Sequence, residues 1–105
     1  MELEGVQHHF LLCNGKTCLR NGAEEVTKAL RDEINKQQLT KTVHTSRTHC
    51  NGRCKDACTV VQYPEGYWFK QVNPEMARQL IRNIKTPNRI ISPAYEFKDG
   101  SFKRV

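Results

Sequence analysis

The spacing of hydrophobic positions in the first third of the chain predicts a buried strand followed by an amphipathic helix. Residues 8–13 form a short run that becomes apolar after two histidines, as a buried strand does. Glu24 and Glu25 suit the positive end of a helix dipole, and we therefore begin the helix at Ala23. Up to Lys36, apolar residues recur at helical spacing: Ala23, Val26, Leu30 and Ile34.

The middle of the chain predicts three further strands. Residues 41–45 form a short β-prone run, and residues 58–63 and 67–72 are rich in β-branched and aromatic side chains. The polar, cysteine-bearing stretch 46–57 is typical of a loop. Between the last two strands, Tyr63-Pro64-Glu65-Gly66 fits a type I turn, with proline second and glycine fourth.

A second helix is predicted from its start signal. Asn73-Pro74-Glu75 supplies an N-cap residue, a first-turn proline and an acid. We expect Pro87 to end this helix. Its buried stripe is predicted to consist of Met76, Ala77, Leu80, Ile81 and Ile84.

The element order β-α-β-β-β-α predicts an α/β protein with a mixed four-stranded sheet and helices packed on it, the thioredoxin-like layout. We expect the 105 residues to form a single domain with a core over about residues 8–84. The tail, residues 85–105, carries several large apolar side chains, among them Ile91, Tyr95 and Phe102. A free linker would not carry so much apolar surface, so we expect the tail to dock on the domain or on a dimer partner.

The five cysteines change the picture, because four of them form two spaced pairs. Cys13 and Cys18 fall where the first strand gives way to a helix, and Cys50 and Cys54 lie in the loop before the hairpin. Redox dithiols and zinc knuckles usually have shorter spacings. These wider spacings suit a flat [2Fe–2S] cluster, in which each iron takes two thiolates. Zinc bound by the same four thiolates is the main alternative.

The neighbours of these cysteines leave further ligands open. Cys58 begins a predicted strand, and we expect it to be a small buried residue, with a role as substitute ligand as the alternative. Because Cys50, Cys54 and Cys58 are evenly spaced, the spacing leaves open which two of them bind iron. His49 could replace a ligand as in Rieske centres, but we expect it on the surface.

Charge predicts the kind of partner. The chain carries a formal net charge of +6, and residues 13–20 and 47–58 hold five basic side chains against one acid, Asp56. This excess predicts an acidic redox partner, either a reductase or an electron acceptor. The chain has no compact basic stripe or RNA-binding motif, so we expect no nucleic-acid partner.

The sequence also bears on location. No apolar run is long enough to span a membrane, so we expect no membrane partner. No secretory signal is visible and the number of cysteines is odd, which disfavours a disulfide framework. We therefore expect a cytoplasmic protein in a reducing environment that keeps thiolates free.

The same motifs give the chain a family likeness. The two cysteine pairs, the Tyr-Pro-Glu-Gly hairpin and the Asn-Pro-Glu helix start together resemble the thioredoxin-like [2Fe–2S] ferredoxins over roughly residues 8–84. They are also similar to the small [2Fe–2S] subunit of respiratory complex I. The resemblance implies a homodimeric one-electron carrier, not an enzyme. It also implies a [2Fe–2S] cluster held by Cys13, Cys18, Cys50 and Cys54.

The chain departs from the family in one place. The second cysteine pair is followed by Gly-Pro in the family pattern, whereas this chain has Ala57-Cys58. A looser likeness to ferredoxin-like proteins of cobalamin synthesis suggests an accessory role in that pathway. Two other functions stay open: a zinc- or cluster-stabilised binding module, and a thiol–disulfide redox protein that uses Cys54 and Cys58.

Overall fold

The computed structural model of this chain describes residues 2–85 and 91–105. Within these ranges, six strands form one sheet in the order β2-β1-β3-β4-β5-β6. The helices are α1 (Lys16–Arg20), α2 (Ala23–Lys36) and α3 (Pro74–Arg82), with a short 3₁₀ turn, η1 (Cys54–Asp56). The strands are β1 (His8–Cys13), β2 (Val43–Thr48), β3 (Val60–Tyr63), β4 (Tyr67–Phe69), β5 (Tyr95–Lys98) and β6 (Ser101–Arg104).

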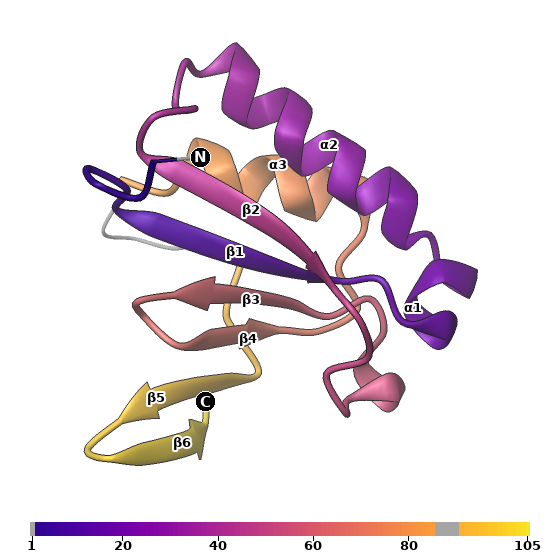
Figure 1. The fold of residues 1–105 in the computed structure, drawn as a ribbon. Coiled ribbons are helices and arrows are strands. Elements are labelled where there is room, and N and C mark those ends of the chain that lie inside the picture. Colours follow the sequence, from indigo (N-terminus) through magenta and orange to yellow (C-terminus); the bar gives the residue numbers. More distant parts are fainter. Residues whose placement is uncertain (1, 86–90) are drawn as a thin grey trace.

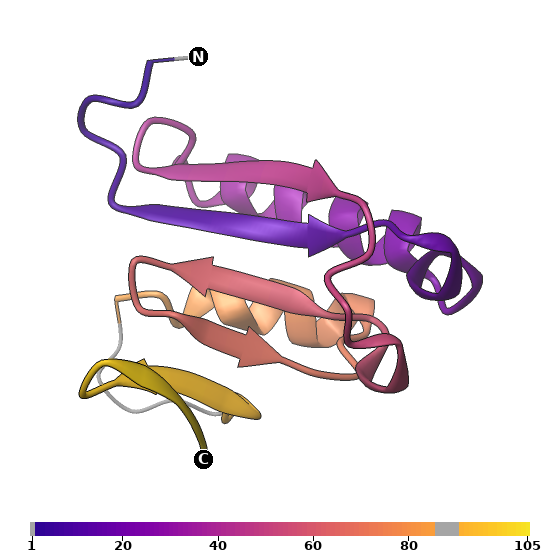
Figure 2. The same ribbon diagram turned by 60° about the horizontal axis from the view of Figure 1, so that its bottom comes forward.

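Strand directions confirm the thioredoxin-like α/β layout. β1 and β2 run parallel and are joined by the α2 crossover, while β3 and β4 form an antiparallel hairpin beside β1. Helices α2 and α3 lie against the same face of the sheet (Figure 1). The α1 helix and the η1 turn lie together at one end of the sheet, beyond the carboxyl ends of β1 and β2 (Figure 2).

The hydrophobic core fills the space between the sheet and these two helices. In β1, Phe10 and Leu12 are fully buried while Leu11 between them is half-buried, so alternate side chains face the helices. Leu30 of α2 and Ile81 of α3 meet this layer from the other side, and both are almost completely buried. Burial of each such side chain contributes about 1.5–3 kcal/mol to folding.

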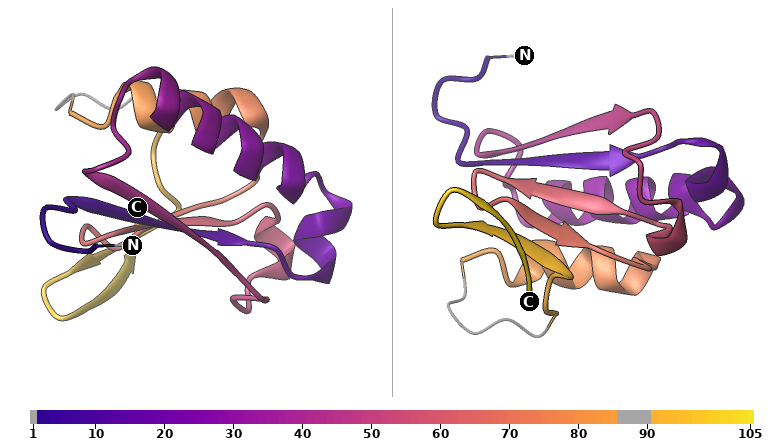
Figure 3. Two further views of the ribbon diagram at one scale, coloured as in Figure 1. Left: turned by 45° about the horizontal axis from the view of Figure 1, so that its top comes forward. Right: turned by 90° about the horizontal axis from the view of Figure 1, so that it is seen from below.

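The sheet is larger than the expected four strands. The tail forms a hairpin, β5–β6, that pairs through Tyr95 with Trp68 of β4 and extends the sheet at that edge (Figure 3). Asp99 and Gly100 both take positive φ angles, of 54° and 88°, and form its turn. Asp-Gly is a strong hairpin signal, and the sequence interpretation overlooked it.

Several element boundaries differ from the predictions. β2 begins at Val43 and continues to Thr48, into the stretch expected to be a loop, because each of its residues pairs with β1. β3 begins two residues later than expected, at Val60, and β4 ends at Phe69. As an edge strand with one half-open face, β2 tolerates polar residues that obscure its pattern.

The turn between β3 and β4 is not the predicted type I turn. Its Tyr63–Pro64 peptide bond is cis, and the N–H of Gly66 donates to the carbonyl of Gln62 over 2.8 Å. The N-terminus of α3 confirms its prediction, because the Asn73 side chain accepts a hydrogen bond from the Met76 N–H (2.8 Å). This helix ends at Arg82, before the expected position; Pro87 lies outside the described residues.

No helix among the described residues is long and apolar enough to cross a membrane.

Candidate iron–sulfur centre

Parallel pairing of β1 and β2 brings the two cysteine-bearing loops together. Cys13 is the last residue of β1 and pairs with Thr48, the last residue of β2, so both strands end at the same edge. Cys18 follows in α1. Cys50 follows Thr48 in the loop that leads into η1, and Cys54 is the first residue of η1. Residues about forty positions apart in the sequence therefore line one small cavity: Cys13, Gly15, Thr17, Cys18, Cys50, Arg53 and Cys54.

The four thiols that line this cavity are arranged as two pairs. Cys13 and Cys18 are buried, whereas Cys50 and Cys54 are exposed. The Sγ atoms of Cys50 and Cys54 are 3.5 Å apart. Two sulfur ligands of a tetrahedral metal with bonds of about 2.3 Å are separated by about 3.8 Å, so this pair is already close to ligand geometry.

The two cysteine pairs line one small cavity. A [2Fe–2S] cluster needs two thiolates at each iron, and the two pairs face one shared cavity as such a cluster requires. The donor set therefore fits a two-iron cluster.

Gly15 allows the two loops to meet. A Cβ at Gly15 would lie 2.9 Å from the Cα of Cys50 and 3.0 Å from its Cβ, closer than real Cβ contacts allow. The absence of a side chain here lets the start of α1 rest directly against the Cys50 backbone.

Gly52 supplies a hydrogen bond to sulfur. Its φ angle is 81°, and its backbone N–H donates to the Cys50 Sγ over 3.3 Å. This donor, followed by the Cys54 thiol, lowers the pKa of Cys50 below its usual value. An N–H donor of this kind stabilises a thiolate and raises the potential of a cluster bound through it.

The buried pair, Cys13 and Cys18, lies in a different environment from the exposed pair. Burial raises the pKa of Cys18 to about 11, and the neighbouring Cys13 thiol adds to the rise. Without a cation the Cys18 thiol stays protonated at neutral pH, because a lone thiolate is costly away from water. Metal binding by Cys18 must therefore release its proton.

Cys58 lies outside this cavity. It is 3% exposed, as expected for a small buried residue, and its Sγ donates to the carbonyls of Cys18 (3.4 Å) and Asn21 (3.2 Å). Cys18 lies within α1 and Asn21 is its C-cap residue, so the Cys58 thiol holds the helix that carries Cys18. Burial also raises the pKa of Cys58.

His49 is exposed, as predicted, and does not line the cavity. Its backbone carbonyl accepts a hydrogen bond from the Cys13 thiol over 3.5 Å. Through this contact the backbone of the loop that carries Cys50 touches Cys13, while the His49 imidazole stays outside the cavity.

Arg53 links the cavity to the neighbouring surface. It lines the cysteine cavity, forms an ion pair with Asp56 (2.9 Å) and donates to the Tyr95 hydroxyl (3.0 Å). The other basic residues of the two loops are also exposed: Lys16, Arg20, Arg47 and Lys55. The sequence interpretation missed the contact with Tyr95, because it depends on the unforeseen hairpin.

Residues 4–85 match the family model of the thioredoxin-like [2Fe-2S] ferredoxins. The chain belongs to this family. The family is defined by its cofactor, so the cluster predicted from the cysteine spacing is confirmed as that of the family. Membership of this family also supports a ferredoxin role for the chain.

Individual relatives agree with this membership. A Priestia megaterium protein assigned as a 2Fe-2S ferredoxin is 48% identical over 79 residues, which cover 75% of this chain and 61% of the relative. A 2Fe-2S ferredoxin of Clostridium pasteurianum is 27% identical, with 73% of this chain and 83% of the relative covered. The chain thus spans less than two thirds of the first of these relatives.

A solved structure shows the same fold. The thioredoxin-like [2Fe-2S] ferredoxin of Aquifex aeolicus superposes with a TM-score of 0.76, at 24% identity, over 89% of this chain and 94% of that one. The predicted family resemblance and the predicted fold are therefore both confirmed.

Proposed function

We propose that this ferredoxin carries single electrons between redox proteins on a [2Fe–2S] cluster held by Cys13, Cys18, Cys50 and Cys54. The observation that carries the proposal is the one small cavity that all four of these cysteines line, with the Sγ atoms of Cys50 and Cys54 3.5 Å apart. A bound cluster would supply reversible one-electron chemistry. With all four thiolates engaged, no open metal position is left for a substrate, so we propose a carrier and not an enzyme.

The protein part of this function is to bury one end of the site and expose the other. Cys13 and Cys18 are 5% and 3% exposed, so their end of the site is shielded from water by α1 and β1. Cys50 and Cys54 reach the surface. The exposed pair therefore marks the edge through which a partner would exchange an electron.

The partner that fits this edge is acidic. Five exposed basic side chains lie in the two cysteine loops: Lys16, Arg20, Arg47, Arg53 and Lys55. Only Arg53 among them has an ion pair within the described residues. A positive surface around the exposed pair steers an acidic reductase or electron acceptor toward it, and its association rate should fall steeply with added salt.

Thiol–disulfide chemistry is less well supported. The thiol of Cys54 is exposed beside Cys50, whereas the Cys58 thiol is buried and donates to carbonyls of the α1 segment. A dithiol enzyme needs an accessible, low-pKa attacking thiol next to its resolving partner, and burial raises the pKa of Cys58.

Reductive titration of the anaerobically purified protein tests the proposal. We expect uptake of one electron per chain, reversed by an oxidant, with bleaching and recovery of the visible absorption. A coloured protein that takes up no electron reversibly would indicate that the cluster has only a structural role. Substrate turnover at the cluster would overturn the carrier assignment.

A further inference from the structure

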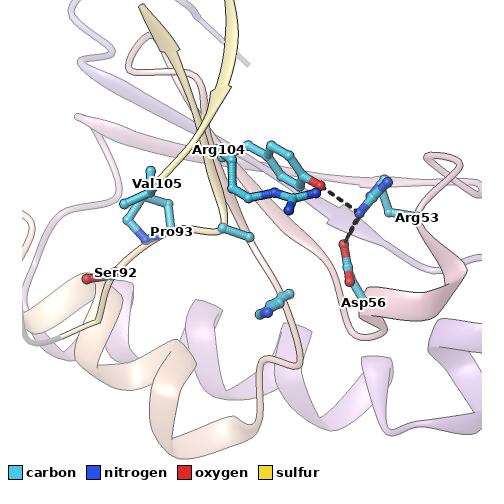
Figure 4. Close-up of a pocket in the computed structure, with 9 residues that line it drawn as sticks. Arg53, Asp56, Ser92, Pro93, Arg104 and Val105 are labelled. Atoms are coloured by element: carbon cyan, nitrogen blue, oxygen red, sulfur yellow. Dashed lines mark hydrogen bonds and ion pairs between the residues drawn. The ribbon is translucent and has the colours of Figure 1, made fainter.

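A second, larger cavity lies beside the cysteine site, between the η1 segment and the C-terminal hairpin. Its volume is about 470 Å³, which is in the range of sites for small molecules. Arg53 and Asp56 form one wall, Lys70 lies after β4, and Tyr95 and Arg104 come from the hairpin. Figure 4 shows Arg104 reaching from β6 toward Arg53.

The charges of this cavity are unbalanced. Three cationic side chains line it against a single acidic side chain, that of Asp56, which already pairs with Arg53 at 2.9 Å. Neither Lys70 nor Arg104 forms an ion pair with any carboxylate in the described part of the chain. The side chains of Lys70 and Arg104 are thus left without an acidic side-chain partner, and an anionic ligand would pair with them.

Tyr95 holds the two arginines in place. The guanidinium carbon of Arg53 lies 5.0 Å from the centre of the Tyr95 ring, and that of Arg104 lies 6.0 Å from it. The Tyr95 hydroxyl also accepts a hydrogen bond from Arg53 (3.0 Å). Stacked and bonded guanidinium groups lose less freedom on binding, and their planar donors match the oxygens of a phosphate.

This cavity combines the family domain with the added hairpin. Arg53, Asp56 and Lys70 lie within the matched residues 4–85, whereas residues 92–95, Arg104 and Val105 lie beyond them. The pairing of β5 with β4 is what closes the second wall. The cavity is therefore a feature that the tail adds to the ferredoxin domain.

We propose that this cavity binds a small phosphate-bearing anion, with Lys70 and Arg104 contacting the phosphate and Arg53 completing the cationic wall. A phosphate monoester carries nearly two negative charges at neutral pH, which suits the two cations that lack an acidic side-chain partner. Binding at this position does not depend on electron transfer, because none of the proposed contacts is made by a cysteine.

Isothermal calorimetry on the cluster-containing full chain tests the site, with phenyl phosphate and inorganic phosphate as probes at constant ionic strength. We expect saturable binding of one phenyl phosphate per chain. Lys70→Gln and Arg104→Gln should each weaken it about tenfold, because each removes a charge-assisted contact. Lys103→Gln is the matched control, because Lys103 is also exposed on β6 but does not line the cavity.

Three results would overturn the proposal. Phenyl phosphate could fail to saturate at millimolar concentrations, or Lys103→Gln could weaken binding as much as Arg104→Gln, which would show general charge attraction. Succinate could also bind more tightly than phenyl phosphate, which would identify a carboxylate site. Lys70 and Arg104 are exposed, so their variants should fold, and amide NMR spectra would verify this.

Discussion

Gly15 and Cys50 meet backbone to backbone at the cysteine cavity. A Cβ on Gly15 would lie 2.9 Å from the Cα of Cys50. This contact sets how closely the α1 segment approaches the second loop, and so how closely one cysteine pair faces the other. Without the contact between Gly15 and Cys50, four cysteines of suitable spacing would not be enough to define a cluster site.

Replacing Gly15 with alanine should therefore impair cluster assembly. The added methyl group must push the Cys50 loop away, and such overpacking typically costs about 1–3 kcal/mol. We expect less iron and sulfide per chain and faster bleaching in air, measured by metal analysis and visible absorption. Lys16→Ala, one residue further on and exposed, is the control. Equal cluster content in Gly15→Ala and in the unmodified protein would contradict this role.

The cysteine variants separate ligands from the supporting thiol. Alanine at position 13, 18, 50 or 54 should abolish the cluster or distort its absorption spectrum, because one iron loses a thiolate. Cys58→Ala should keep the spectrum but lower the stability by about 1–3 kcal/mol, because a buried hydrogen-bonded thiol is lost. A colourless Cys58→Ala protein beside a normal Cys54→Ala protein would reverse the assignment.

Arg53 should influence the cluster through its charge. It lines the cysteine cavity, so its guanidinium favours the reduced, more negative state of a cluster bound there. We expect Arg53→Gln to lower the reduction potential measured by redox titration. Lys41→Gln, at the opposite end of β2, should leave the potential unchanged. Equal shifts in both variants would indicate an effect of net charge alone.

Glu33 should make the stability depend on pH. This carboxylate is 3% exposed, accepts a hydrogen bond from Gln37 (2.8 Å) and lies 3.4 Å from Arg82. The Gln37 hydrogen bond, followed by the Arg82 guanidinium, lowers the pKa of Glu33 from its ordinary 4.5. Because the folded pKa is the lower one, its stabilisation is present above pH 4.5 and is lost as pH falls through the folded pKa.

Urea unfolding of Glu33→Gln measures this contribution. We expect a loss of about 1–3 kcal/mol at neutral pH, which shrinks as the pH falls below the ordinary pKa of a carboxyl group. Asp32→Asn is the control on the same helix, because its carboxylate is exposed and pairs with the exposed Lys28. A deficit of the same size at acidic and neutral pH would show that the Glu33 charge plays no part.

Gly66 should be needed to dock the C-terminal hairpin. Its φ angle is 72°, and a Cβ there would lie 2.6 Å from the Cβ of Phe97. Gly66→Ala should therefore expose the β5 amides to hydrogen exchange. Gly100→Ala is a matched control: Gly100 has a φ of 88°, but a Cβ there would meet no atom within 4 Å, so this variant reports backbone strain without the clash. Comparable protection of β5 in both variants would refute the docking role.

Local signals predicted most of the ferredoxin domain. Residues next to each other in the sequence predict the start of α2 at Ala23 and the Asn73 cap of α3, and both predictions are confirmed. The strand length of β2 was not predictable in this way. Residues 46–48 are polar, and they form a strand only because they pair with Leu11, Leu12 and Cys13 of β1.

The sequence also placed the four cysteines in two loops, but it could not show how the loops meet. That geometry depends on a backbone contact at Gly15 and on the common edge at which β1 and β2 end. The anion cavity was missed for a similar reason. Arg53 and Arg104 are 51 positions apart, and only the docking of the hairpin brings both to Tyr95.

Electron transfer by this protein requires that the four thiols hold a [2Fe–2S] cluster. Anaerobic purification followed by visible absorption and by iron, sulfide and zinc analysis tests it most directly. We expect a red-brown protein with about two irons and two sulfides per chain and little zinc. A colourless protein with about one zinc per chain would contradict the cluster and remove the basis for electron transfer.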